Sequence, residues 1–322
     1  MISRAQLLAG PGYITFKTAS WRMASDLKVM LKWTAQDVTD ALKGPFTKVV
    51  TDRWIEVTGT PLYYDPTTTN GIFFPYISLA STPPGTQIFG AADSACSIVG
   101  NDGKTITLAA AAITSMPSLH LGTDRAIYGP ITIIGVPATG TDPSTATSFY
   151  QATANWLSNS FTPPAIPATA TLARQKWSAV YGADTGWSSF QAFKGFEISH
   201  ELKLKWHEDN GQRVGATLAG YRAMCKCQPS ANTIDQMATE MLFAGTAGVG
   251  GHLVASQGQR YSANSADLII SGASSGTVTL KNATMESGEI NFSAEELNQG
   301  EVTFITNVGD SSGANVASLL LA

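Results

Sequence analysis

Residues 278–304 read VTLKNATMESGEINFSAEELNQGEVTF, and apolar side chains recur in this stretch at every second position. The apolar members of these runs are Val278, Leu280, Ile290, Phe292, Val302 and Phe304. Strict alternation of apolar and polar residues predicts strands with one buried face and one solvated face. Gly288 and Gly300 interrupt the runs, as turn residues do. The stretch therefore predicts a meander of short strands that completes a sheet.

The same alternation predicts two hairpins with longer strands. Residues 27–33 and 49–57 read as half-buried strands near the N-terminus. Residues 196–206 form a strand of about eleven residues, where five or six is usual. Asp209-Asn210-Gly211 then turns the chain back into a second long strand over 214–227. The chain is thus expected to be mainly β and antiparallel, a sandwich or half-barrel with long loops.

One helix is expected between the second hairpin and the C-terminal meander. Its apolar positions are spaced as one helical face: Ile234, Met237, Ala238, Met241 and Leu242. Thr233 to Gln236 fits a capping box, and Gly245 is a suitable stop. This helix is expected to pack on the sheet.

The domain organisation follows from composition. Residues 1–136 and 194–306 are expected to form one discontinuous β domain, interrupted by a block over 137–193 that is rich in Pro, Thr and Trp. This block reads as an insertion or an outer lobe, and residues 307–322 read as a C-terminal tail. The two hairpin regions look alike, but no internal repeat is strong enough to assign from the sequence.

Composition narrows the classes of function. Only 14% of the 322 residues are charged and the net charge is −4, which argues against tight binding of duplex DNA. Residues 1–60 carry eight Lys and Arg against five Asp and Glu, whereas residues 194–322 carry eight against thirteen. A basic region and an acidic region on one molecule favour head-to-tail association, although single surface pairs contribute little. No leader or membrane span is evident, so folding in a reducing cytoplasm is expected.

No catalytic, cofactor-binding or metal site is expected. The three cysteines, Cys96, Cys225 and Cys227, form no disulfide framework, and the last two supply only half of the ligands of a structural zinc site. The four histidines lack ligand spacing, and the glycine-rich run over 245–251 lacks the lysine of a P-loop. The chain is therefore expected not to be an enzyme.

Several strings along the chain carry a resemblance. They are STPPGTQIFG (81–90), GPITI (129–133) and GFEI (195–198), followed by a long hairpin, one helix and the C-terminal meander. In this order the chain resembles the major tail tube proteins of tailed bacteriophages, over most of 10–136 and 194–306. Residues 137–193 depart from the compact pattern of that family.

The resemblance implies a structural virion protein. Members of that family form hexameric rings whose inner sheets join into a continuous β-barrel. The rings stack into a tail tube around a tape measure protein, between tail terminator and baseplate proteins, and DNA later passes through the tube during ejection. The expected location is the virion tail, after assembly in the host cytoplasm, with only transient and non-specific contact with DNA and none with a membrane.

A tube of this kind needs a lining that does not hold phosphate, and acidic residues meet that need. Glu286, Glu289 and Glu301 are the candidates for the lumen. Leu319, Leu320, Leu321 and Trp206 are the candidates for contacts between subunits. The N-terminal arm (1–12) and the tail are expected to become ordered only in the assembly, since an exposed apolar patch marks a contact site.

Two other classes of function remain open. One is another β-sandwich virion or binding module, such as a baseplate or decoration protein, which the tryptophan-rich loops would suit. The other is a carbohydrate-active enzyme that uses the acidic cluster Glu286, Glu289, Glu295 and Glu296. A solvated face is the more common role for such a cluster.

Overall fold

A computed structural model gives the fold of the chain. It describes residues 12–17, 19–42, 44–62, 73–77, 82–89, 96–100, 105–122, 128–137, 150–153, 164–165, 176–181, 190–230, 265–273, 276–288, 300–306 and 319–321. Within these ranges the secondary structure is β, which confirms the expected class, and no helix there is long and apolar enough to cross a membrane. The expected helix around residues 234–242 lies outside the described residues.

The strands divide between the two halves of the chain. The first half holds β1 (Tyr13–Phe16), β2 (Ala19–Asp40), β3 (Gly44–Pro61), β4 (Cys96–Val99), β5 (Thr105–Leu108), β6 (Ala110–Ser115), β7 (Leu119–Leu121), β8 (Ile131–Val136) and β9 (Tyr150–Thr153). The second half holds β10 (Trp177–Tyr181), β11 (Phe190–Asp209), β12 (Gln212–Ser230), β13 (Ala266–Gly272), β14 (Thr277–Gly288), β15 (Val302–Thr306) and β16 (Leu319–Leu321).

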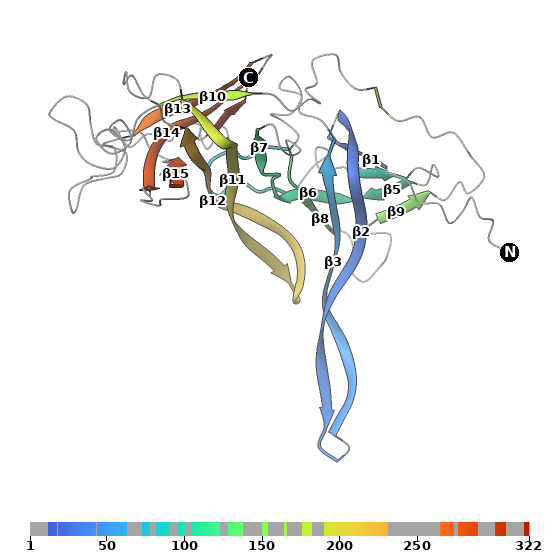
Figure 1. The fold of residues 1–322 in the computed structure, drawn as a ribbon. Helices are drawn as coiled ribbons and strands as arrows, with labels where there is room; N and C mark the ends of the chain where they lie inside the picture. Colours follow the sequence, from blue (N-terminus) through green and yellow to red (C-terminus); the bar gives the residue numbers. More distant parts are fainter. Residues whose placement is uncertain are drawn as a thin grey trace.

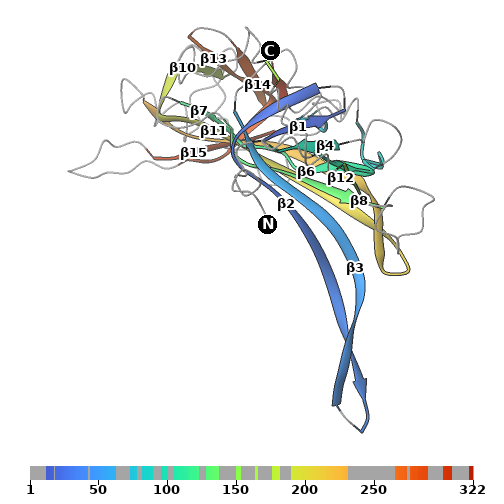
Figure 2. The same cartoon turned by 90° about the vertical axis from the view of Figure 1, so that its right-hand side faces the viewer.

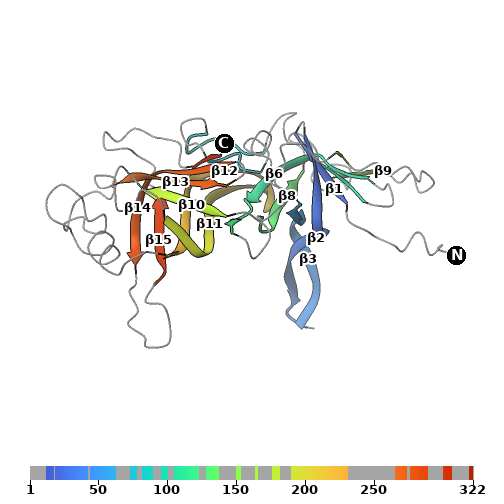
Figure 3. The same ribbon diagram turned by 45° about the horizontal axis from the view of Figure 1, so that its top comes forward.

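Two antiparallel sheets result. The order of strands is β6-β8-β3-β2-β1-β4-β5-β9 in one and β10-β13-β14-β15-β12-β11-β7 in the other, where β16 also pairs with β14 and β10 also pairs with β11. The sheets lie side by side, the first at the right of Figure 3 and the second at the left. One continuous hydrophobic core includes side chains of both, among them Trp21 of the first sheet and Phe196 and Phe304 of the second.

The two sheets repeat one arrangement of strands. In the first, β1 pairs with β2 and β4, β2 with β3, and β3 with β8. In the second, β10 pairs with β11 and β13, β11 with β12, and β12 with β15. β5 pairs with β4, and β6, separated from β5 only by Ala109, pairs with β8. Together they correspond to the single strand β14, which pairs with β13 and β15. The first strand of each half, β1 or β10, pairs with strands on both of its sides, so the pairings form a closed circle. Each half is therefore a flattened barrel of six strands when β5 and β6 are counted as one strand.

Corresponding strands lie at a nearly constant separation along the chain. β2 begins at residue 19 and β11 at 190, β4 at 96 and β13 at 266, and β8 at 131 and β15 at 302. The last strands agree as well, because β9 pairs with β5 and β16 with β14. A constant separation of about 170 residues is typical of an internal duplication. We call residues 13–153 the first repeat and residues 177–321 the second repeat.

The register within the hairpins repeats too. Met23 pairs with Pro61 just before a bulge in β2, and Ala192 pairs with Pro229 just before a bulge in β11. Three further bulges match between the repeats. In the hairpins, the bulge at Thr34/Ala35 corresponds to that at Lys203/Leu204, and the bulge at Val38/Thr39 to that at His207/Glu208. Outside the hairpins, the bulge at Ile113/Ser115 corresponds to that at Met285/Ser287. Because a bulge fixes the register and bend of a strand pair, matching bulges make the two hairpins equivalent residue by residue.

The repeat changes three expectations drawn from the sequence. The sequence alone did not allow a repeat to be assigned, whereas the strand pairings do. The block over 137–193 contributes β9 to the edge of the first sheet and β10 to the second, so these two strands belong to the sheets. Residues 319–321 of the tail form β16 on β14 of their own chain, so they are ordered without a neighbour.

Candidate assembly surface

Two long hairpins leave the body of the molecule in the same direction. β2 and β3 have 22 and 18 residues, and β11 and β12 have 20 and 19. Figures 1 and 2 show both hairpins below the two sheets, with the β2–β3 hairpin reaching furthest. Such long strands leave extended edges and faces beyond the core, which single chains normally cover or pair. The hairpins are therefore the part of the described structure best suited to contact other molecules.

A buried polar cluster joins the two hairpins. Asp52 on β3 is 6% exposed and Gln212 at the start of β12 is 8% exposed. The Gln212 amide donates to Oδ1 of Asp52 (3.1 Å) and to the carbonyl of Arg53 (2.8 Å), and accepts from the backbone N–H of Arg53 (3.3 Å). Arg213 adds a backbone N–H bond to Asp52 Oδ1 (3.0 Å) and an ion pair to Oδ2 (3.1 Å). We call these four residues the clasp.

Aromatic side chains complete the clasp. The guanidinium of Arg213 lies 4.2 Å from the ring centroid of Trp54 and 5.0 Å from that of Trp206, within the range of cation–π contacts. Trp206 also packs at 5.6 Å from the ring of Phe89. The candidate contact residue Trp206 is therefore used inside the chain, where it holds the second hairpin against the first repeat.

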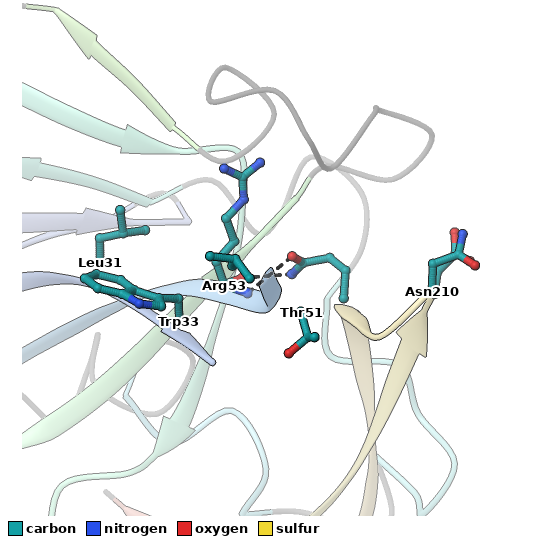
Figure 4. Close-up of a pocket in the computed structure, with 8 residues that line it drawn as sticks. Leu31, Trp33, Thr51, Arg53 and Asn210 are labelled. Carbon is teal, nitrogen blue, oxygen red and sulfur yellow. Dashed lines mark hydrogen bonds between the residues drawn. The ribbon is translucent and has the colours of Figure 1, made fainter. Parts of the chain in front are cut away.

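An open cleft of about 550 Å³ lies beside the clasp. It is lined by Leu31, Trp33, Val50, Thr51, Arg53, Asp209, Asn210 and Gln212. Figure 4 shows Leu31 and Trp33 next to each other on β2, with Asn210 on the turn of the other hairpin beyond them. The apolar wall belongs to the β2–β3 hairpin and the polar wall to the β11–β12 turn. The cleft thus presents exposed apolar surface rather than a set of convergent catalytic groups.

The solvated face of the β11–β12 hairpin carries charges of both signs in pairs. Glu201 pairs with Arg222 directly opposite and with Lys203 at 3.5 Å. The hydrogen bond from Arg222 and the nearby positive charges lower the pKa of Glu201. Lys226 pairs with Glu301 at 3.2 Å. Because these cations already have carboxylate partners, the face is not a strip of unpaired positive charge of the kind that binds phosphate.

The residues predicted for the lumen and for contacts fall in different places. Glu286, at the bulge of β14, and Glu301, just before β15, are both exposed, and Glu289 lies outside the described residues. Leu319 and Leu321 are buried in the core of their own chain, and only Leu320 is exposed. An intermolecular contact at this tail would therefore involve Leu320, because β16 uses the other two leucines internally.

His200 occupies the covered face of β11. Its Nδ1 lies 2.8 Å from the hydroxyl of Tyr221, and its ring packs 5.3 Å from that of Phe74. Burial lowers the pKa of His200 from 6.5 to about 4, and the carbonyl of Pro117 opposes this shift only in part. The fold therefore holds the neutral imidazole.

A pH dependence of stability follows. Between pH 6.5 and about 4 the unfolded chain binds a proton at His200 that the folded chain does not, so the free energy of unfolding should fall as the pH is lowered through this range. Urea titrations at several pH values measure it. His200→Leu should remove this part of the slope, and Gly220→Ala, which changes no titratable group, should leave it. Equal slopes for the wild type and His200→Leu would contradict the prediction.

The three cysteines lie in the core. Burial raises the pKa of Cys96 to about 12, and a hydrogen bond with Cys227 together with burial raises that of Cys225 well above its usual value. Cys96 and Cys225 are therefore thiols and not reactive thiolates. Within the described ranges no three His, Cys, Asp or Glu side chains are grouped as metal ligands would be.

Comparison with known proteins gives no match, either to a protein-family model or to a curated protein.

Proposed function

We propose that the chain is a structural subunit of a phage tail tube, in which rings built from its hairpins stack into a conduit for DNA. The observation that carries the proposal is the duplicated barrel with two equivalent long hairpins that extend in one direction and are clasped together. Ring closure would pair or cover the strand edges that a single chain leaves open. The hairpins of successive chains would then form the wall around the bore.

The duplication bears on the number of chains in a ring. The family that the sequence resembles builds hexameric rings, and each chain of this protein supplies two hairpins. In the proposal each repeat of this chain takes the place of one subunit of that family, so a ring of six repeats needs three chains, while a ring of six chains would hold twelve repeats. Three chains of 33.9 kDa have a mass of about 102 kDa and six have a mass of about 203 kDa. We propose the ring of three chains.

The lining of the bore would come from solvated strand faces whose charge does not hold DNA. Glu286 and Glu301 remain candidates because both are exposed. The solvated face of the β11–β12 hairpin is a further candidate, since three of its cations, Lys203, Arg222 and Lys226, are paired with carboxylates. Within a screening length of about 8 Å in physiological salt, charges on these faces would act on passing DNA. A tape measure protein would occupy the bore before DNA, with terminator and baseplate proteins at the two ends.

An alternative is a baseplate or decoration protein of the same β class. The exposed apolar residues on the β2–β3 hairpin would suit either role, because each requires contact with other protein. For a carbohydrate-active enzyme, only Glu286 of the acidic cluster lies among the described residues.

Electron microscopy and native mass measurement of the purified full chain test the proposal. We expect rings of uniform bore that stack into tubes, with a ring mass of about 102 kDa. A mass of about 203 kDa would support a tube but would contradict the ring of three chains. A chain that stays monomeric at high concentration and forms no rings would contradict the tube itself.

A further inference from the structure

Equivalent faces of the two hairpins have different environments. In the first hairpin, Trp33 pairs with Arg53 on one side of a bulge and Ala35 pairs with Val50 on the other side. The equivalent pairs around the matching bulge of the second hairpin are Leu202 with Tyr221 and Leu204 with Leu218. Leu218 is 0% exposed and Tyr221 is 2% exposed. Trp33 is 59% exposed, and Val50 is 54% exposed. The same face is thus covered in the second repeat and bare in the first.

The first repeat provides the cover for the second hairpin. Ala112 on β6 and Ile134 on β8 pack with Ala216, Leu204 and Trp206 in one apolar cluster. The backbone of residues 85–88 runs along the outer edge of β12, where the N–H and carbonyl of Leu218 bond to the carbonyl of Thr86 (2.9 Å) and the N–H of Gly85 (2.7 Å). The second hairpin therefore has both its face and its edge satisfied by the neighbouring repeat.

The first hairpin lacks this cover within the described structure. β3 pairs with β8 only from Ile55 to Gly59, so its described pairing further out, around Val50, is with β2 alone. Leu31 is 55% exposed beside Trp33, and both line the open cleft of about 550 Å³. Large apolar side chains that are grouped and exposed on one surface mark a contact site.

We propose that this bare face of the β2–β3 hairpin, formed by Leu31, Trp33 and Val50, is the docking surface for a second copy of the chain, and that the second repeat of that copy covers it. The chain already contains this contact once, between its first repeat and its second hairpin. Repeating it between molecules places a second repeat beside the next first repeat, a head-to-tail contact that generates a ring if the rotation closes.

Charge supports a second repeat as the occupant. The β2–β3 hairpin, residues 19–61, holds six Lys and Arg against five Asp and Glu, whereas the second repeat, residues 177–321, holds eight against fourteen. A contact of this hairpin with a second repeat therefore joins opposite net charges, whereas a contact between two such hairpins joins like net charges. The inference depends on the proposed ring for its biological setting, but its test separates the two.

The test uses Trp33→Ser in the full chain, with Val38→Ser on the opposite face of the same hairpin as the matched control, since Val38 is also exposed. Sedimentation over a concentration series should show that Trp33→Ser raises the concentration needed for assembly by at least about tenfold, and Val38→Ser by less than about twofold. Thermal melting of the dilute variants should match the wild type, because both side chains are exposed in the monomer. Assembly of Trp33→Ser at the wild-type concentration would overturn the docking surface while leaving the ring in place.

A photo-cross-linking residue at position 33 identifies the occupant. Thr284 and Ile305 are the residues of the second repeat that are equivalent to Ala112 and Ile134, and both are buried in the monomer. Other residues of the second repeat must therefore make the contact, and cross-linking identifies them. We expect cross-links between chains that fall within 177–321. Cross-links only to residues 13–153 of the other chain would indicate a symmetric contact between hairpins and would overturn the proposal, as would a lack of any cross-link between chains. A wild-type chain that never assembles would overturn the proposed ring as well.

Discussion

Gly195→Ala should destabilise the chain by about 3–5 kcal/mol, because this position combines a left-handed backbone with a close approach of another strand. Gly195 has a φ of +84°, a region that side chains with a Cβ rarely adopt. A Cβ there would lie 2.7 Å from Cα of Gly122 and 2.9 Å from the carbonyl carbon of Leu121. Both are backbone atoms, so the collision cannot be relieved by a side-chain rotation. Urea denaturation of the purified variant measures the loss.

The location of Gly195 extends the effect beyond stability. It lies in the bulge of β11, next to the point where Phe196 pairs with Leu121 of β7. β7 comes from the first half of the chain, so this pairing joins the two halves, and the substitution should loosen it. Gly220→Ala is the matched control, because its Cβ would meet no atom within 4 Å, and it should change stability by less than about 0.5 kcal/mol. Equal stabilities of the two variants would contradict the prediction.

The class of the fold was predictable because alternation is a local signal. The runs around Leu27–Trp33 and Phe196–Trp206 place every second side chain on one face, and both stretches lie in the strands β2 and β11. The turn at Asp209-Asn210-Gly211 was predictable for the same reason, since its residue types tolerate a positive φ, and Asn210 and Gly211 have φ values of 49° and 82°. The lengths of the hairpins were underestimated, because their outer parts carry mixed residues without strict alternation.

The duplication was not predictable from residue identities. Several equivalent core positions share apolar character but not residue type: Trp21 and Phe190, Ile14 and Ala179, Val57 and Cys225, and Ile133 and Phe304. Burial selects for a nonpolar side chain of suitable volume and not for one residue type, so the two repeats can diverge while the strand pairings remain. Bulges and pairings retain the repeat because they depend on backbone geometry.

The candidate site was missed for a different reason. Asp52 and Gln212 are 160 residues apart, and neither belongs to a motif. In the sequence, Asp52 reads as an exposed strand residue, and only the packing of one hairpin on the other buries it. The apolar character of the tail is evident in the sequence. Its burial, however, depends on a free edge of β14 that pairs with β16, and the order of residues does not show that edge.

Asp52→Ala should lower the free energy of unfolding by about 2–3 kcal/mol, because it leaves buried partners of the clasp unpaired. Gln212 would lose one acceptor, and the guanidinium of Arg213 would keep its two indole rings without its anion. The side chain of Arg213 is 24% exposed, so water would compensate in part and the loss should stay below that of a fully buried ion pair. Urea denaturation and hydrogen exchange at the N–H of Arg53, which bonds to Gln212, measure the two consequences.

Two further variants separate the charge of Asp52 from its hydrogen bonds. Asp52→Asn keeps an oxygen for the N–H groups but removes the charge, so it should lose less stability than Asp52→Ala and retain slow exchange at Arg53. Asp37→Ala removes an ion pair with Lys48 on the same hairpin that is 3.6 Å long and has side chains 62% and 71% exposed, and it should change stability by less than about 0.5 kcal/mol. A loss for Asp37→Ala as large as that for Asp52→Ala would mean that the hairpins depend on surface charge and not on the buried clasp. If the prediction holds, the clasp sets the angle between the two hairpins, and through it the curvature of the wall that successive chains would form.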